Sequence, residues 1–519
     1  MALRYNIPKY SDRIGQDVQV KFGGLDRRLA ACDGAICAMT NMCGDEYPLA
    51  AVRKGRRTLR TFSGKINGFY QADRLMLVVG TDFYVLQNFI PVKKGTVKAT
   101  LQTFATLGDY VVMMPEKKYF RMSTSEFDSL EASWSGTASF ADGTYAGEAA
   151  EGCRIVTTGT EFPFKVGDAV TISGAATAAN NQSIIIREVS DDKKSLGFYE
   201  HSFTVEENQT LTIERKVPDM DYICENENRL WGCKGSTIYA SKPGDPFNWN
   251  VFDGLASDSY AVDVGSDGDF TACFSYLGYP IFFKEDHIYK VYGSKPSNYQ
   301  VMPSATLGVM EGSSRSLAVA GEVLYYLSRV GIMAYSGGIP QRISEPLGDM
   351  TYKYARAGSD GIRYYVSMLN PSSEYELFCY DTSVKQWYRE DDLEVFGFTS
   401  GSMMTSDGQL MTYRALNPDE TSIPSELEFA DFVEGSPNKK STAKLLVRVE
   451  LESKSELTVK MSFDGGAYET VKTLVSGGKQ SYYLPILVKR CDRFRVKFEG
   501  KGMWRLYSLT REYSEGSAN

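Results

Sequence analysis

The stretch that decides the fold contains YLGYPIFFKEDHIYKVYG at 276–293 and VAGEVLYYLSRVGIMAYSGG at 319–338. Each piece has a hydrophobic run, a short polar step and a second run that ends in Tyr. In the first piece, Pro280–Phe283 and Ile288–Tyr292 are separated by Lys284–His287. Short runs rich in Val, Ile, Tyr and Phe around a compact polar step predict antiparallel β-hairpins.

The same pattern recurs along the chain and gives seven candidate hairpins. They lie at 72–87, 107–122, 228–242, 277–292, 321–335, 360–381 and 400–414. Hairpins repeated at intervals of a few tens of residues favour radial repetition, in which each small sheet buries its faces against its neighbours. We therefore predict an all-β chain built on a β-propeller of about seven blades, over residues 61–130 and 217–415.

Residues 131–216 have a short-strand pattern of their own, which begins with FKVGDAVTISGA at 164–175. This pattern predicts a small β-barrel or sandwich inserted between two hairpins. Residues 441–519 alternate between apolar and polar side chains and predict a C-terminal β-sandwich.

Two remaining segments are expected to be irregular. Residues 1–60 are rich in Gly pairs and Asp-Gly turns, and we interpret them as an extended N-terminal arm. Residues 416–440 carry six acidic residues before Lys439, and we interpret them as a linker with an exposed acidic strand.

Composition narrows the class of protein. The 519 residues carry a formal charge of −8, which disfavours a protein that coats DNA through overall positive charge. No apolar run approaches the ~20 residues that span a bilayer, and the N-terminus has no apolar signal core, so we expect no membrane anchor and no export. The odd count of nine Cys indicates free thiols and assembly in a reducing cytoplasm.

The sequence favours neither a metal nor a cofactor. Cys32, Cys37 and Cys43 lie close together, but they lack a fourth nearby ligand and the C-x-x-C spacing of zinc sites. The acids of Trp249–Phe270 do not follow the spacing of a calcium loop. Asp and Gly are ordinary turn formers, and we favour that interpretation.

No catalytic motif is recognisable, and we predict that the protein is not an enzyme. Its two histidines, His201 and His287, lie in no nucleophile motif. A glycosidase with paired carboxylates is the strongest enzymatic alternative. Sialidase-like propellers repeat S-x-D-x-G-x-T-W, to which only Ser462–Gly466 comes near. The many Tyr and Phe are better explained as core residues than as sugar platforms.

A basic run near the N-terminus, RKGRRTLR at 53–60, has two interpretations. Its cations can be solvated on an arm that packs over the fold. Alternatively Arg53, Lys54, Arg56 and Arg57 can dock on an acidic partner or a DNA backbone. We predict docking on a neighbouring component for these four residues.

Several stretches together resemble one family of virion proteins from tailed phages. FGGLDRR, CDGAICAMTNM and YPLAAVRKGRR within 22–57 carry the resemblance at the start of the chain. ENRLWGCKGSTIYASKPGDPFNWNVF at 227–252, GYPIFFKEDHIYKVYGS at 278–294 and SRVGIMAYSGG at 328–338 carry it in the middle. LPILVKRCDRFRVKFEGKGMWRLYSLTREYSEGS at 484–517 carries it at the end. Residues 130–217 are the least covered.

The family is that of stabilisation or tail proteins, similar in role to the propeller hubs and nozzles of short-tailed phages. The resemblance implies a structural subunit of a neck or tail ring, a homo-oligomer that is expected to be a hexamer, assembled in the host cytoplasm and located in the virion. The implied partners are the portal or adaptor, other tail proteins, and double-stranded DNA in transit. Acidic residues would suit a channel wall because they repel phosphates. The candidates are Asp258, Asp263, Asp267 and Asp269.

Two other functions remain open from the sequence alone. Its aromatic residues and terminal sandwich also suit a tail-associated adhesin that binds or degrades carbohydrate. A cellular propeller scaffold is the third possibility.

Overall fold

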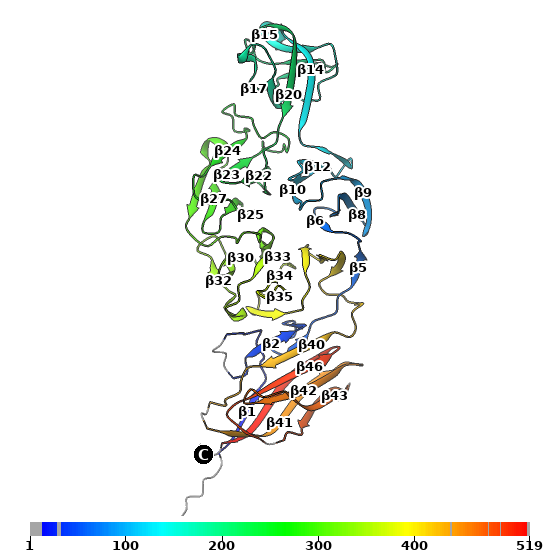
Figure 1. Cartoon of the computed structure of the whole chain (residues 1–519), viewed down its shortest axis with the longest axis vertical. Helices are drawn as coiled ribbons and strands as arrows, with labels where there is room; N and C mark the ends of the chain where they lie inside the picture. The colour runs from blue at the N-terminus through cyan, green and yellow to red at the C-terminus, as the bar shows by residue number, and fades with distance from the viewer. Residues whose placement is uncertain (1–12, 29–32, 436–437, 476, 488, 516–519) are drawn as a thin grey trace, which may run out of the picture. The chain divides into compact units, whose positions relative to one another are not determined.

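The computed structural model describes residues 13–28, 33–435, 438–475, 477–487 and 489–515 (Figure 1). The chain divides into two compact units: a first unit of residues 1–63 with 315–519, and a second unit of residues 64–314. The all-β class is confirmed. Helical structure in the described residues is limited to four short 3-10 turns: Ala178–Asn180, Pro296–Asn298, Ser314–Ser316 and Glu345–Leu347.

The second unit contains four four-stranded antiparallel sheets whose strands follow one another in chain order. The first two sheets are β6 Ile66–Gln71, β7 Leu75–Val79, β8 Asp82–Gln87 and β9 Ile90–Thr96, then β10 Thr103–Leu107, β11 Tyr110–Met114, β12 Lys118–Arg121 and β13 Glu126–Ser129. The next two are β21 Tyr222–Asn226, β22 Arg229–Lys234, β23 Thr237–Ala240 and β24 Tyr260–Asp263, then β25 Ala272–Tyr276, β26 Tyr279–Phe283, β27 Ile288–Tyr292 and β28 Gln300–Ser304.

Consecutive sheets of the second unit share hydrophobic cores, and β11 shows how. Val111 and Met113 lie in a core with side chains of β7 and β8, whereas Val112 and Met114 lie in a core with side chains of β21 and β22. Because alternate side chains of a strand point to opposite faces, β11 is buried on both sides. Middle strands of this kind are nearly continuous hydrophobic runs, as strands covered on both faces are.

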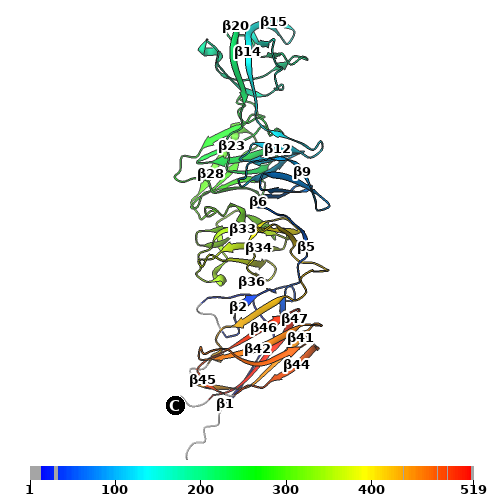
Figure 2. The same cartoon turned by 45° about the vertical axis from the view of Figure 1, so that its right-hand side comes forward.

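The inserted domain occupies residues 131–216, between the second and third of these sheets. It is one seven-stranded antiparallel sheet in the order β17-β16-β20-β14-β15-β19-β18. Its strands are β14 Ala132–Tyr145, β15 Glu148–Thr157, β16 Ala169–Ser173, β17 Ser183–Ile185, β18 Glu188–Val189, β19 Ser195–Gly197 and β20 Glu206–Arg215. β14 and β20 carry the chain out and back side by side (Figures 1 and 2), and Ala132 pairs with Arg215 at their base.

The first unit contains three further four-stranded sheets. Two follow the chain: β29 Ala318–Ala320, β30 Val323–Ser328, β31 Gly331–Tyr335 and β32 Gln341–Arg342, then β33 Lys353–Ser359, β34 Arg363–Leu369, β35 Tyr375–Asp381 and β36 Gln386–Arg389. The third combines β37 Val395–Phe398, β38 Ser402–Thr405 and β39 Gln409–Thr412 with β5 Thr58–Thr61 from the start of the chain.

All seven predicted hairpins are present as the middle strand pairs of these sheets. The pairs are β7–β8, β11–β12, β22–β23, β26–β27, β30–β31, β34–β35 and β38–β39. The sheets are consistent with the blades of a β-propeller.

The ends of the chain together build a two-sheet domain in the first unit. One sheet has the order β3-β4-β47-β41-β44, with β1 on β47 and β45 on β41, and the other has the order β2-β40-β46-β42-β43 (Figure 1). The early strands are β1 Arg13–Gln19, β2 Ile36–Thr40, β3 Met42–Cys43 and β4 Ala50–Val52. The late strands are β40 Pro424–Phe429, β41 Lys440–Leu451, β42 Glu456–Phe463, β43 Glu469–Val475, β44 Gly478–Leu484, β45 Arg490–Cys491, β46 Phe494–Lys501 and β47 Trp504–Glu515. Trp504 joins the sheets by donating from Nε1 to Ser425 Oγ at 2.8 Å.

Two segments differ from the sequence-based expectation. The expected arm over residues 1–60 supplies β1–β4 to the two-sheet domain and part of β5 to the last four-stranded sheet. The expected linker over 416–440 contains β40, whose Ser425, Leu427 and Phe429 are buried. The interpretation of residues 1–60 as an extended arm was wrong, because β1, β2 and β4 pair with strands hundreds of residues away, where a local pattern gives no sign of them. The acidic strand expected within 416–440 is present as β40, but it is half-buried in a sheet and not exposed.

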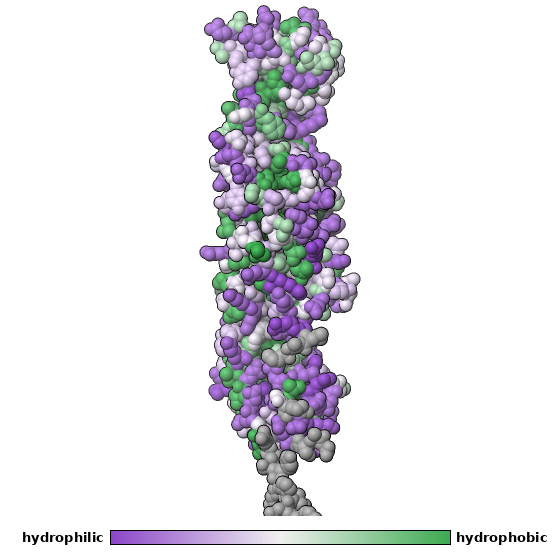
Figure 3. Space-filling model, turned by 90° about the vertical axis from the view of Figure 1, so that its left-hand side faces the viewer, coloured by the Kyte–Doolittle hydropathy of each residue, from purple (hydrophilic) through white to green (hydrophobic). Residues whose placement is uncertain are grey.

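Figure 3 shows one face of the molecule, on which hydrophobic residues form small separate groups among hydrophilic ones. The strands therefore direct their apolar side chains mainly inward. In the part of the chain that is described, no helix is long and apolar enough to cross a membrane.

Candidate functional site

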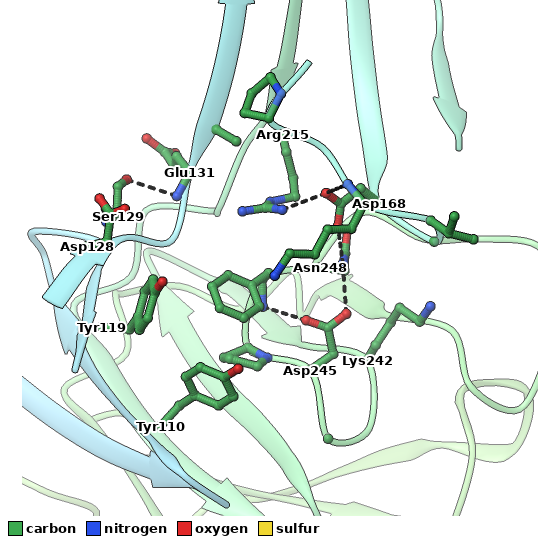
Figure 4. Close-up of a pocket in the computed structure, with 18 of the residues that line it drawn as sticks. Tyr110, Tyr119, Asp128, Ser129, Glu131, Asp168, Arg215, Lys242, Asp245 and Asn248 are labelled. Carbon is green, nitrogen blue, oxygen red and sulfur yellow. Dashed lines mark hydrogen bonds and ion pairs between the residues drawn. The ribbon is translucent and has the colours of Figure 1, made fainter. Parts of the chain in front are cut away.

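A cavity of about 620 Å³ lies at the base of the inserted domain, within the second unit. One part of its lining comes from β11–β13 and the start of β14, a second from the loop before β16, and a third from the loop after β23. Figure 4 shows Asp128, Ser129 and Glu131 on one side of the cavity and Lys242 and Asn248 on the other.

Arg215 and Asp168 form the buried centre of the cavity wall. Arg215 donates from Nη1 to Asp168 Oδ2 at 2.6 Å and from Nη2 to the carbonyl of Leu130 at 3.0 Å. Both side chains are buried, so this ion pair is shielded from solvent. Nε of Arg215 is also buried and has no hydrogen-bond partner among the described residues.

Asn248 connects this ion pair to the loop after β23. Its Nδ2 donates to Asp168 Oδ1 at 3.1 Å and to Asp245 Oδ2 at 2.7 Å, and its Oδ1 accepts from the backbone N–H of Ala169 at 3.0 Å. Ala169, Ile185 and Val251 add a small apolar contact beside it. The inserted domain is therefore held against the loop by buried bonds as well as by its two connecting strands.

Three aromatic rings form one side of the cavity. Phe247 meets Tyr110 and Tyr119 edge-on, with ring centroids 5.3 and 5.1 Å apart. Tyr119 donates to Glu126 Oε1 at 2.7 Å. Burial raises the pKa of Tyr119, and the bond to Glu126 raises it further, so the hydroxyl stays protonated as a donor.

Two cations of the lining are not engaged in ion pairs. Lys165 and Lys242 have no carboxylate partner among the described residues, although Lys165 Nζ lies 5.9 Å from the centroid of Phe247. The lining contains neither His nor Cys, so the cavity offers donors, acceptors and ring faces but no thiol or imidazole chemistry.

The cavity was not among the sites predicted from the sequence. Its lining comes from segments between Tyr110 and Asn248 that meet only after the inserted domain has folded back on its neighbours. The run KPGDPFNWN at 242–250 was the one available signal, because it combines turn residues with aromatic residues.

The basic run near the N-terminus lies in the first unit. Two of its four predicted docking residues are buried. Arg53 is 1% exposed and donates to Asn41 and to both carboxylate oxygens of Glu420, at 2.8 to 2.9 Å. Arg56 is 5% exposed, donates to Glu390 Oε2 at 2.6 Å and also bonds Asp391. The predicted docking role does not fit these two residues, because their charges are already neutralised inside the fold.

The other two predicted docking residues differ from their neighbours. Lys54 and Arg57 are exposed, and no ion pair to either is present in the described part of the chain. The four predicted docking residues thus separate into two buried cations, Arg53 and Arg56, and two surface cations, Lys54 and Arg57.

The four predicted channel acids also differ in exposure. Asp258 is buried, and its Oδ2 accepts from the backbone N–H groups of Gly254 and Leu255 at 2.6 and 3.0 Å, so it holds a turn and cannot line a channel. Asp263, Asp267 and Asp269 are exposed.

Lys284 stabilises the loop between β24 and β25, which carries Asp267 and Asp269. Its buried ammonium donates to the carbonyls of Ser266 and Gly268 at 2.9 and 2.6 Å. Burial lowers the pKa of Lys284, while the acids around it act in the opposite direction. These hydrogen bonds hold the backbone of the loop that carries Asp267 and Asp269 in one conformation.

The three cysteines considered for zinc do not form a described site. Cys37 and Cys43 are free thiols, and burial raises the pKa of Cys37 to about 11 and that of Cys43 to about 12. Cys32 lies outside the described residues. Within those residues, no group of three or more His, Cys, Asp or Glu side chains is arranged to hold a metal ion.

Comparison with known proteins identifies no family. No protein-family model matches the chain, and no curated protein matches its sequence.

Solved structures show distant similarity. Hsv2 of Kluyveromyces lactis is 9% identical, with 63% of this chain and 98% of that chain covered at a TM-score of 0.28. A putative 6-phosphogluconolactonase from Bacteroides fragilis is 11% identical, with 74% and 97% covered at a TM-score of 0.25. The endosialidase of phage phi92 is 10% identical, with 76% and 68% covered at a TM-score of 0.22. At these values none of their activities extends to this chain.

Proposed function

We propose that the protein is a structural subunit of a phage neck or tail ring, a hub or nozzle that forms part of the DNA channel and stabilises packaged DNA. In this proposal the seven four-stranded sheets are the blades of one β-propeller, and the two-sheet domain is a β-sandwich. The subunit is not an enzyme. It assembles as a homo-oligomer, expected to be a hexamer, against the portal or adaptor and other tail proteins in the virion.

The observation that carries the proposal is how the two ends of the chain combine. The stretches of the resemblance at 22–57 and 484–517 contain β2–β4 and β45–β47, and β4 pairs with β47 through Ala50 and Leu506. The two outermost parts of the resemblance thus belong to one folded domain. β5 is likewise fastened in a sheet with β37–β39. A subunit in which the first and last described strands, β1 and β47, pair with each other suits a part that bears load.

The exposed acids support the channel role. Asp267 and Asp269 are exposed on a loop that Lys284 holds, and Asp263 is exposed at the end of β24 just before it, in a chain of net charge −8. Carboxylates on a channel wall repel the phosphate backbone and let DNA slide. Lys54 and Arg57 remain as surface cations for a neighbouring virion component.

Electron microscopy of the purified protein, combined with mass photometry, tests the ring. We expect closed rings of one symmetry, formed either by the protein alone or after the portal or adaptor is added. A monomer at all concentrations and with both partners would contradict the proposal.

A further inference from the structure

We propose that the cavity at the base of the inserted domain binds a neutral oligosaccharide. This inference goes beyond the ring function and does not rest on it. It starts from the chemistry of the lining, which combines free donors, free acceptors and aromatic rings in a volume of about 620 Å³.

The polar groups of the lining suit a ligand with many hydroxyl groups. Lys165 and Lys242 are donors without ion-pair partners among the described residues. Asp128 is exposed, and apart from the backbone N–H of Ser129 at 2.7 Å its oxygens are free to accept. A sugar hydroxyl both donates and accepts, so one ligand can bond to both kinds of side chain.

The aromatic residues supply an apolar surface beside these groups. Tyr110 and Phe247 are partly exposed, and their edge-on contact keeps the rings in place. The C–H face of a sugar ring is apolar and packs against an aromatic ring, while its hydroxyls point to polar neighbours. In Figure 4 Tyr110 and Tyr119 lie together on one side of the cavity, below Asp128 and Ser129.

Other classes of ligand fit less well. Asp168 is paired with Arg215 and Glu131 with Lys117. The remaining acids of the lining, Glu126, Asp128 and Asp245, outnumber Lys165 and Lys242, so phosphorylated and polyanionic ligands are disfavoured. An apolar ligand would leave these charged groups desolvated and unpaired. A neutral ligand with many hydroxyl groups avoids both penalties.

The walls are held in position before any ligand binds. The ion pair of Arg215 with Asp168 and the bonds of Asn248 join the inserted domain to the loop after β23. The free-energy cost of ordering the site when a ligand binds is therefore small, which favours binding.

Saturation-transfer NMR and calorimetry on the full chain test the proposal. The probes are neutral tetrasaccharides built from glucose, galactose, mannose or N-acetylglucosamine, with a heparin tetrasaccharide as the anionic probe. Asp128→Asn and Lys242→Met change exposed or half-exposed side chains of the cavity. Asp73→Asn and Lys65→Met make the same changes on exposed side chains outside the cavity lining.

We expect at least one neutral tetrasaccharide to bind, with about tenfold weaker binding to each cavity variant, as loss of one hydrogen-bond partner predicts. The two outer variants should bind like the unaltered protein. Failure of every neutral probe at millimolar concentration would overturn the proposal. So would preference for the heparin probe, or equal binding by cavity and outer variants. None of these results depends on ring formation.

Discussion

At the scale of single residues, Arg56 shows how a charged residue can be misread from sequence. The crowding of four cations at 53–57 suggested a surface for docking, yet Arg56 is buried against Glu390 and Asp391. Removing one partner of a buried ion pair leaves the others uncompensated, which is far more costly than losing a surface pair.

We therefore predict that Arg56→Ala lowers the free energy of unfolding by about 3–5 kcal/mol. The matched control is Arg57→Ala, which alters an exposed cation one position away and should change stability by less than about 0.5 kcal/mol. Urea unfolding followed by tryptophan fluorescence measures both. Equal effects of the two variants would contradict the assignment of Arg56 to the interior.

A second residue-scale prediction concerns acid. Burial alone would raise the pKa of Glu420 and Glu376, but bonds to Arg53 and Arg27 outweigh it and hold both below the ordinary 4.5. A carboxyl with a lowered folded pKa contributes stability above its unfolded pKa, and this contribution is lost as the pH falls through the folded value.

Melting temperature should therefore fall as the pH drops below about 4.5, because the unfolded chain takes up protons at these carboxyls before the folded protein does. Glu420→Gln should melt lower than the unaltered protein near neutral pH and should approach it in acid. If the two melting temperatures instead differ by the same amount at every pH, the destabilisation by Glu420→Gln does not come from the lost charge, which would contradict the prediction.

At the scale of elements, the hairpins pair with neighbours in sequence, whereas other strands pair with partners far along the chain. The turn after β25 is typical of a hairpin, because Leu277 and Gly278 both have positive φ, of 53° and 77°. β5, by comparison, has no local partner. It pairs with β39, and beside this pairing a Cβ on Gly408, just before β39, would lie 2.2 Å from the carbonyl oxygen of Phe62, just after β5, so only Gly allows the approach.

The pairing of β1, β2, β4 and β5 with late strands predicts that the chain folds only when residues 1–63 are present. A protein of residues 64–519 should be insoluble or melt without cooperativity, because Leu427 and Phe429 lose their cover from β2. Co-expression of residues 1–63 as a separate chain should restore soluble protein. A shuffled 1–63 segment is the control and should not restore it, whereas a stable 64–519 protein would contradict the expectation.

The inserted domain gives the opposite expectation. Ala132 and Arg215 are cross-strand neighbours, so a short Gly-Ser turn can replace the residues between them. We predict that the shortened protein retains a cooperative melt at a lower temperature, because the apolar contact of Val251 and the bonds of Asn248 are lost. Differential scanning calorimetry measures this. Asn248→Ala in the full chain should account for part of the decrease, and aggregation of the shortened protein would show that the domain is required for folding.

At the scale of the whole molecule, charge governs the response to DNA. The chain carries a net charge of −8, and its buried Arg53 and Arg56 are unavailable to phosphates. Exposed charges act over a Debye length of only ~8 Å at physiological salt, so side chains on the DNA-facing surface decide the outcome.

We predict no appreciable affinity for duplex DNA at physiological salt. Changing Asp263, Asp267 and Asp269 together to Lys should create affinity that falls steeply with salt, as counterion release requires. Fluorescence anisotropy with a short labelled duplex measures both proteins. Tight, salt-sensitive binding by the unaltered protein would instead assign Lys54 and Arg57 to DNA contact.

The amino-acid sequence by itself determined the local structure of this protein. Hydrophobic runs such as Ile281–Phe283, with turn residues such as Gly278, specified hairpins whose hydrogen bonds join residues within about a dozen positions of one another. All seven hairpins could be predicted for that reason.

Only the tertiary structure decided what the charged residues do and where a cavity forms. Arg56 meets Glu390 across 334 residues of sequence, and Asp168 meets Asn248 across 80. A side chain is buried or exposed according to partners at such distances, and the local pattern around Arg56 or Arg215 contains no record of them. Burial then sets the electrostatics, because a charge that is paired inside the fold is no longer available at its surface.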